Sequence, residues 1–158
     1  MKILVVNCGS SSLKFQLIDM DNEEVLAKGK CDRIGASEGE IGSPFIEYKG
    51  NGNKVKEELP LPDHVAAFRA VVRYLTDEKV GVVKELSEIS AIGHRVVHGS
   101  SYFFDSCIIN DEVIDVIDKC SEFAPLHNPA HLQGIEACTN VFGKDVPQVV
   151  VFDTAFHQ

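Results

Sequence analysis

The first nineteen residues constrain the fold of this chain more than any other stretch. Ile3 to Val6 form a short, continuous apolar run of mostly branched residues, which is typical of a strand buried on both faces. The polar segment "NCGSSS" follows, and from Leu13 to Asp19 apolar and polar residues alternate with a period closer to 2 than to 3.6. We therefore expect two strands joined as a hairpin, with its tip at Cys8 to Ser11.

Turn and strand signals continue after this hairpin. The segment "DMDNEE" at 19–24 predicts a second turn, and "EVLAKGK" at 24–30 predicts a third strand. Residues 34–53 are rich in Gly, Ser and Glu, so we expect an exposed loop or hairpin there, with one strand candidate in "PFIEYK".

The segment "PDHVAAFRAVVRYLTDE" predicts the clearest helix of the chain. Its helical spacing places Val65, Phe68, Val72 and Leu75 on one face. Asp63 stands where an N-terminal cap is expected, because its carboxylate can accept from the first free backbone N–H groups.

The second half of the chain predicts alternating strands and helices. Strand character returns at 90–99 and 147–153, a short helix is expected over 110–120, and Asn128 followed by Pro129 is typical of a helix start. Three strands, a loop-rich insert, and then alternating helices and strands favour an α/β domain with a mixed sheet.

Composition excludes several function classes. The chain has 158 residues, 44% of them hydrophobic, which suits one globular domain with a core, and its net charge of −9 argues against a nucleic-acid surface. Its five cysteines form an odd set without a CxxC pair, so we expect reduced thiols. The apolar run at the N-terminus is too short for a signal peptide or a membrane span. We expect a cytoplasmic protein without a membrane partner.

Polar residues stand near the expected strand ends, where open α/β sheets bind their ligands. Asn7 follows the first strand, Arg95 and His98 flank the strand around 94–97, His127 precedes a helix, and Asp153 ends the last strand. These residues are candidates for one site.

The Gly-Ser turn admits several interpretations. A Walker A loop is excluded, since its second glycine is missing and a strand follows. Ser11 and Lys14 match the S-x-x-K pattern of serine acyl-enzymes, but residues three apart on a strand point to opposite faces. A hairpin whose N–H groups and hydroxyls hold phosphates, with Gly9 allowing close approach, and a purely structural polar tip both stay open.

Four separated motifs carry a family resemblance. The segments "VNCGSSSLKF", "GHRVVHG", "APLHNPA" and "VFDTAFHQ" resemble, in the same order, the N-terminal motifs of the acetate kinase family. The resemblance implies a ribonuclease-H-like domain, a mixed sheet flanked by helices, of the superfamily that includes sugar kinases, actin and heat-shock chaperones. It also implies that residues 1–158 are the N-terminal lobe of a two-lobe kinase whose C-terminal nucleotide-binding lobe is absent from this chain.

The chemistry implied by this resemblance is reversible transfer of the ATP γ-phosphoryl group to acetate, giving acetyl phosphate and ADP, with Mg²⁺ or Mn²⁺. This lobe alone is expected to be inactive, and the full enzyme to be a homodimer. Two departures from the family pattern, at Ser100-Ser101 and at His131, leave propionate or butyrate open as substrates. A non-catalytic binding or regulatory module of the actin-like superfamily is the alternative.

The resemblance assigns the phosphate and metal ligands to matching positions. Asn7, Ser10, Ser12 and Lys14 are expected to bind the nucleotide phosphates, with hairpin structure as the alternative role of the last three. Asn7 and Asp153 are expected to hold magnesium and so to act in catalysis; a helix cap is the alternative role of Asp153.

The remaining positions belong to the acyl substrate. Arg95 is expected to bind a carboxylate or phosphoryl group bidentately in catalysis, with a surface ion pair as its alternative. His127 is expected to donate a hydrogen bond to acyl or phosphoryl oxygens, or else to serve structure only. Val97 and Leu126 match a small pocket for the acetate methyl group, with core packing as the alternative.

Overall fold

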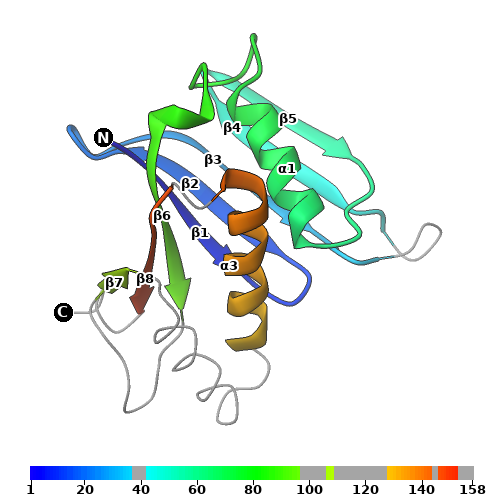
Figure 1. Ribbon diagram of the computed structural model, residues 1–158. Helices are drawn as coiled ribbons and strands as arrows, with labels where there is room; N and C mark the ends of the chain where they lie inside the picture. The colour runs from blue at the N-terminus through cyan, green and yellow to red at the C-terminus, as the bar shows by residue number, and fades with distance from the viewer. Residues whose placement is uncertain (37–41, 97–105, 109–127, 144–145, 153–158) are drawn as a thin grey trace.

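The chain forms eight strands and two longer helices, seen in a computed structural model that describes residues 1–36, 42–96, 106–108, 128–143 and 146–152. The expected helix over 110–120 lies outside these residues. The elements, in chain order, are β1 Lys2–Cys8, β2 Leu13–Asp19, β3 Glu24–Asp32, β4 Phe45–Gly50, β5 Asn53–Glu58, α1 His64–Leu75, the single 3₁₀ turn η1 Leu86–Glu88, β6 Ile89–Val96, β7 Ser106–Ile108, α3 Asn128–Phe142 and β8 Gln148–Phe152 (Figure 1).

All eight strands belong to one mixed sheet, in the order β5-β4-β3-β2-β1-β6-β8-β7. β1 pairs with β6, and β6 with β8, in parallel, while the strands from β1 to β5 pair antiparallel, as do β7 and β8. Parallel neighbours need long crossovers, and α1 and α3 lie within them. The expected α/β domain with a mixed sheet is confirmed.

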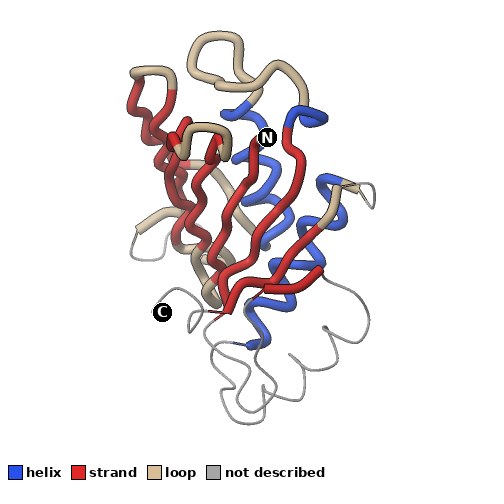
Figure 2. Tube along the Cα trace, turned by 90° about the vertical axis from the view of Figure 1, so that its left-hand side faces the viewer, coloured by secondary structure: helices blue, strands red, loops and turns tan. Residues whose placement is uncertain are grey.

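Burial alternates along the first hairpin and divides the sheet into two faces. The prediction that residues 3–6 are buried on both faces was therefore wrong, since Ile3 and Val5 are only half-buried. On β1 and β2, Leu4, Val6, Leu13, Phe15 and Leu17 are at most 2% exposed and form the centre of the core. Both helices lie on this same side of the sheet (Figure 2), where α1 contacts β4 and α3 contacts β1 and β6. We call this the covered face and the opposite side the open face.

The helix α1 begins as predicted but is rotated relative to the expected apolar face. Asp63 is its N-cap, and the side chain accepts a hydrogen bond of 2.9 Å from the backbone N–H of Ala66. Phe68 and Leu75 are buried, as expected, whereas Val65 and Val72 are only half-buried. The buried face of this helix includes the small residues Ala67 and Ala70. The prediction considered only large apolar residues and therefore missed them.

The prediction of an exposed loop over residues 34–53 was partly wrong. β4 is buried at Phe45, Ile46 and Tyr48, and it pairs with a strand that was not predicted, β5. Asn51 and Gly52, with φ of +49° and +76°, form the tight turn between them, as Asn-Gly does in hairpins. β5 was missed because four of the six residues of its sequence, "NKVKEE", are charged, which suits an edge strand.

Two element boundaries and one short strand also differ from expectation. β3 runs two residues beyond the predicted 24–30, and the short strand β7 was not predicted at all, because three residues carry almost no periodicity. Asn128 is the first helical residue of α3 rather than the residue before it. Among the described residues, no helix is both long and apolar enough to cross a membrane.

Candidate functional site

Three of the predicted site residues lie side by side on the open face. Asn7 of β1 pairs directly with Lys14 of β2. Val6 pairs with His94 across β1 and β6, so the next residues along these parallel strands, Asn7 and Arg95, are also neighbours. The three side chains line one hollow of about 470 Å³.

The sequence analysis placed Asn7 after its strand and Arg95 at the edge of its strand, but both residues lie within strands. Asn7 is the penultimate residue of β1, and Arg95 the penultimate residue of β6. Because flanking residues such as Val6 and His94 are buried on the covered face, alternation turns Asn7 and Arg95 toward the open face. The strand backbone therefore holds the two groups in place without help from a loop.

The hollow is strongly cationic, a feature that the sequence reasoning did not identify. Besides Lys14 and Arg95 it is lined by four further lysines from β3, β4 and β5, against one acidic residue, Glu47. The signal was present as lysines two residues apart in "AKGK", which places them on one face of a strand. The four lysines are Lys28, Lys30, Lys49 and Lys54.

The Gly-Ser turn is held by a helix on the covered face. The N–H of Gly9 donates to the Ser12 carbonyl (2.9 Å), and His64 Nε2, at the start of α1, donates to the Gly9 carbonyl at 2.9 Å. A Cβ on Gly9 would stand 2.6 Å from Ser12 Oγ, so a larger residue at this position would force the Ser12 side chain to move. The predicted hairpin is confirmed, with its tip one residue later, over residues 9–12.

The serines of this turn do not share the surroundings of Asn7, Lys14 and Arg95. Ser10 is exposed and lines a separate hollow of about 330 Å³ between the turn and the two helices, together with His64. Ser12 is half-buried against Gly9. Ser11 lies in the turn and Lys14 on β2, so the helical turn that an S-x-x-K nucleophile requires is not formed.

Behind Arg95, a partly buried hydrogen-bond chain joins three elements of the fold. His94 Nε2 donates to Gln148 Oε1 (2.7 Å), and Gln148 Nε2 donates to Thr139 Oγ1 (2.7 Å). The Thr139 hydroxyl donates to the Ile135 carbonyl within α3 at 3.1 Å. Such hydrogen-bond chains fix the relative positions of their members, here β6, β8 and α3.

The buried thiols are unsuited to nucleophilic chemistry. Cys8, Cys31 and Cys138 are free and buried beneath the site. Burial raises the pKa of Cys8 and of Cys31 to about 12, and it also raises the pKa of Cys138 well above the ordinary value. Since the thiolate is the reactive form, these side chains act as small apolar residues.

The other predicted site residues, Val97, Leu126, His127 and Asp153, lie outside the described residues. For a magnesium ion, the described part of the chain offers the Asn7 side-chain oxygen, a hard donor of the kind that Mg²⁺ prefers. Within that part, no group of three or more His, Cys, Asp or Glu side chains is arranged to hold a metal. A metal bound here would therefore need oxygen ligands from a phosphate and from residues beyond those described.

Comparison with known proteins gives a consistent result along the whole chain. The sequence model of the acetokinase family matches residues 2–158. The chain is 55% identical to the acetate kinase of Acetivibrio thermocellus and 53% identical to that of Clostridium botulinum, over 100% of its own length in both cases. It spans 38% of the length of each of these relatives.

Solved structures agree with the sequence matches. Porphyromonas gingivalis acetate kinase superimposes with a TM-score of 0.89 at 42% identity, covering 98% of this chain and 38% of that one. A propionate kinase from Francisella tularensis gives 0.85 at 40% identity, covering 99% and 38%. The expected fold class, the mixed-sheet domain of the ribonuclease-H-like superfamily, is confirmed. This chain belongs to the acetokinase family.

Proposed function

We propose that this chain forms the N-terminal part of a kinase that transfers the γ-phosphoryl group of ATP reversibly to the carboxylate of acetate. The observation that carries the proposal is the convergence of Asn7, Lys14 and Arg95 in one cationic hollow on the open face. Both reactants are anions, so a site that brings them together must supply cations and neutral donors.

Each of the three side chains has a distinct role in this proposal. The planar guanidinium of Arg95 binds a carboxylate or the transferring phosphoryl group through two parallel hydrogen bonds. Lys14 supplies a point charge to the nucleotide phosphates, and the Asn7 amide donates a neutral hydrogen bond to them. Because β1, β2 and β6 hold these groups by backbone pairing, little reorganisation is needed as charge develops.

The remaining assignments follow from the family. We place magnesium or manganese between the ATP phosphates, Asn7 and Asp153, where the metal would neutralise phosphate charge. His127 would donate to acyl or phosphoryl oxygens, and Val97 and Leu126 would enclose the acyl methyl group. Ser10 and Ser12 would shape the phosphate turn from its covered side.

The rest of the enzyme completes the site. A C-terminal lobe of the same protein would bind adenosine and close on the phosphates, and the complete enzyme would be a cytoplasmic homodimer. In this proposal the 158-residue chain supplies the substrate-side half of the site.

The test is synthesis of acetyl phosphate from ATP and acetate, measured as the hydroxamate. A protein of full family length with this sequence as its N-terminal part should be active, whereas the 158-residue chain alone should not turn over. Inactivity of the full-length protein, once shown to be folded, would favour a non-catalytic module. Robust synthesis by the short chain would refute the need for a second lobe.

A propionate kinase is a second candidate, favoured by the close superposition on the Francisella tularensis structure. One extra methylene changes discrimination by only about 1–3 kcal/mol, so relative rates decide between the two activities. The ratio of kcat/KM for acetate to that for propionate and butyrate should be measured on one preparation. A ratio below one would replace acetate with the longer acid as the substrate.

A further inference from the structure

The open face carries a lysine cluster that extends well beyond the three site residues. Lys14, Lys28, Lys49 and Lys54 are exposed, Lys30 is half-buried, and all five line the same hollow as Arg95. The chain has 15 basic and 24 acidic residues. Six basic residues and one acidic residue line this hollow, so the charge distribution is opposite to that of the protein as a whole.

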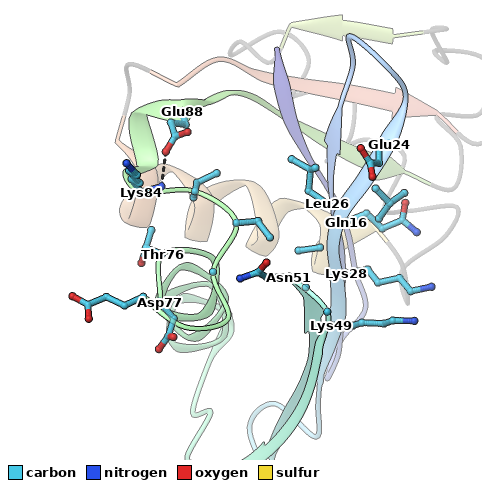
Figure 3. Close-up of a pocket in the computed structure, with 18 residues that line it drawn as sticks. Gln16, Glu24, Leu26, Lys28, Lys49, Asn51, Thr76, Asp77, Lys84 and Glu88 are labelled. Atoms are coloured by element: carbon cyan, nitrogen blue, oxygen red, sulfur yellow. Dashed lines mark hydrogen bonds between the residues drawn. The ribbon is translucent and has the colours of Figure 1, made fainter.

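Strand pairing places these lysines directly against one another. Lys14 pairs with Lys30, Lys28 with Lys49, and Lys49 with Lys54. Figure 3 shows the side chains of Lys28 and Lys49 extending in the same direction, away from the loop that carries Thr76 and Asp77. Like charges directly opposite on a sheet destabilise it, so this arrangement has a cost in the unliganded protein.

The lysine side chains of this cluster form no salt bridges within the part of the chain that the structure describes. The salt bridges there involve Lys2, Arg73 and the N-terminal ammonium group instead. Glu47 pairs with Lys30 across β3 and β4, so one negative charge offsets part of the repulsion among the five lysines, and a bound anion would relieve the rest.

We propose that the lysine cluster is a binding surface for an oligophosphate, a chain of several linked phosphate groups, that continues from the Asn7–Arg95 site. The row from β2 to β5 crosses three strand spacings, about 14 Å, which exceeds the reach of a single phosphate or carboxylate. Ammonium groups act as point charges and adapt to phosphates at several positions. This inference rests on the proposed function for the identity of the neighbouring site.

The size of the hollow favours an oligophosphate over a macromolecule. A volume of about 470 Å³ accommodates a small ligand. The phosphates can come from two sources, the tail of a nucleotide or a free inorganic oligophosphate, and both present the same chemistry to the lysines.

The test measures binding of inorganic tripolyphosphate to the full-length protein by calorimetry at low and at physiological salt. The variant Lys28→Gln/Lys49→Gln removes two charges from the cluster, and neither residue is assigned to catalysis. Lys79→Gln/Lys84→Gln removes two exposed lysines after α1 and outside this hollow, as a matched control. We expect about tenfold weaker binding for the first variant at low salt, and a change within about twofold for the control.

The possible outcomes distinguish the two sources of phosphate, and they also distinguish this inference from the proposed kinase function. If ATP affinity falls together with tripolyphosphate affinity, the ligand is a nucleotide tail; if only tripolyphosphate affinity falls, it is a free oligophosphate. Equal weakening in both variants, no weakening in either, or tighter binding of a poly-glutamate peptide than of tripolyphosphate would overturn the inference. Failure of the proposed kinase activity would appear separately, as absent acetyl phosphate synthesis by the unaltered protein.

Discussion

The two faces of the sheet are built from alternate residues of the same strands, yet they do different work. On β1 and β2 the covered face presents Leu4, Val6 and Phe15, while the open face presents Asn7 and Lys14. The covered face is packed by α1 and α3. The open face has exposed polar groups at fixed spacing. Packing on the covered face thus makes the strands rigid, and the rigid strands hold the polar side chains of the open face in position.

The largest effect on stability is expected for truncation on the covered face. Phe68 of α1 is fully buried and packs edge-on against Phe142 of α3, with ring centroids 6.4 Å apart. Phe68→Ala should lower the free energy of unfolding by about 3–5 kcal/mol, because it removes apolar contacts and leaves a cavity. Gln16→Ala on the open face is the control, expected within about 0.5 kcal/mol. Urea denaturation measures both, and similar losses would contradict the division into two faces.

The next largest effect is expected for Arg95 on the open face, and it concerns catalysis. In the full-length enzyme, Arg95→Ala should lower kcat by about a hundredfold or more, equivalent to about 2.7 kcal/mol of transition-state stabilisation. Arg95→Lys keeps the charge but not the planar fork, so it should recover only part of the rate. Steady-state kinetics, with circular dichroism to verify folding, provide the measurement. A near-normal rate for the alanine variant would remove Arg95 from the mechanism.

A smaller effect is expected at the link between the two faces. His64 is buried at the start of α1, and its ring donates to the Gly9 carbonyl in the Gly-Ser turn. His64→Ala should cost about 1–3 kcal/mol, because the carbonyl loses its donor. It should also accelerate hydrogen exchange of the Gly9 amide, which donates to Ser12. Asp63→Asn, next to it, keeps a capping side chain and should leave this amide protected. Unchanged exchange in His64→Ala would show that the turn holds its shape without α1.

The smallest effect concerns a cation that, unlike the lysine cluster, has a partner. Lys2 donates to Glu88 at 3.0 Å, and this bond, followed by the N–H groups of Glu85 and Lys84, lowers the pKa of Glu88 from 4.5 to about 2. A lowered pKa means that the stabilisation is present above pH 4.5 and is lost as the pH falls toward 2. The contribution is small because the carboxylate is 35% exposed and solvent screens the ion pair.

Thermal unfolding of the wild type and of Glu88→Gln tests this pH dependence. The difference in Tm should be largest near pH 6 and should narrow steadily between pH 4.5 and pH 2. Glu78→Gln removes an exposed carboxylate from the same part of the chain and serves as the control for net charge. A difference in Tm that stays constant through this range would show that Glu88 gains nothing from its partners.

Local patterns predicted the elements better than they predicted their surroundings. A continuous apolar run located β1, alternation located β2, and Asp63 marked the start of α1, because these signals arise from neighbouring residues. β5 and β7 were missed, since a charged edge strand and a three-residue strand depend on their pairing partners for stability. The lysine cluster was missed for the same reason, because it forms only when β2, β3, β4 and β5 align in register.

The sequence by itself determined the hairpin, the start of α1 and the family, because an apolar run, alternation, a capping residue and four ordered motifs are all local properties. Only the tertiary structure decided which polar residues meet. It joined Asn7, Lys14 and Arg95 through parallel and antiparallel pairing, placed Ser10 in a different hollow, and gathered lysines from four strands on the open face. Strand order and register are set by packing between residues far apart in the chain, and no single segment encodes them.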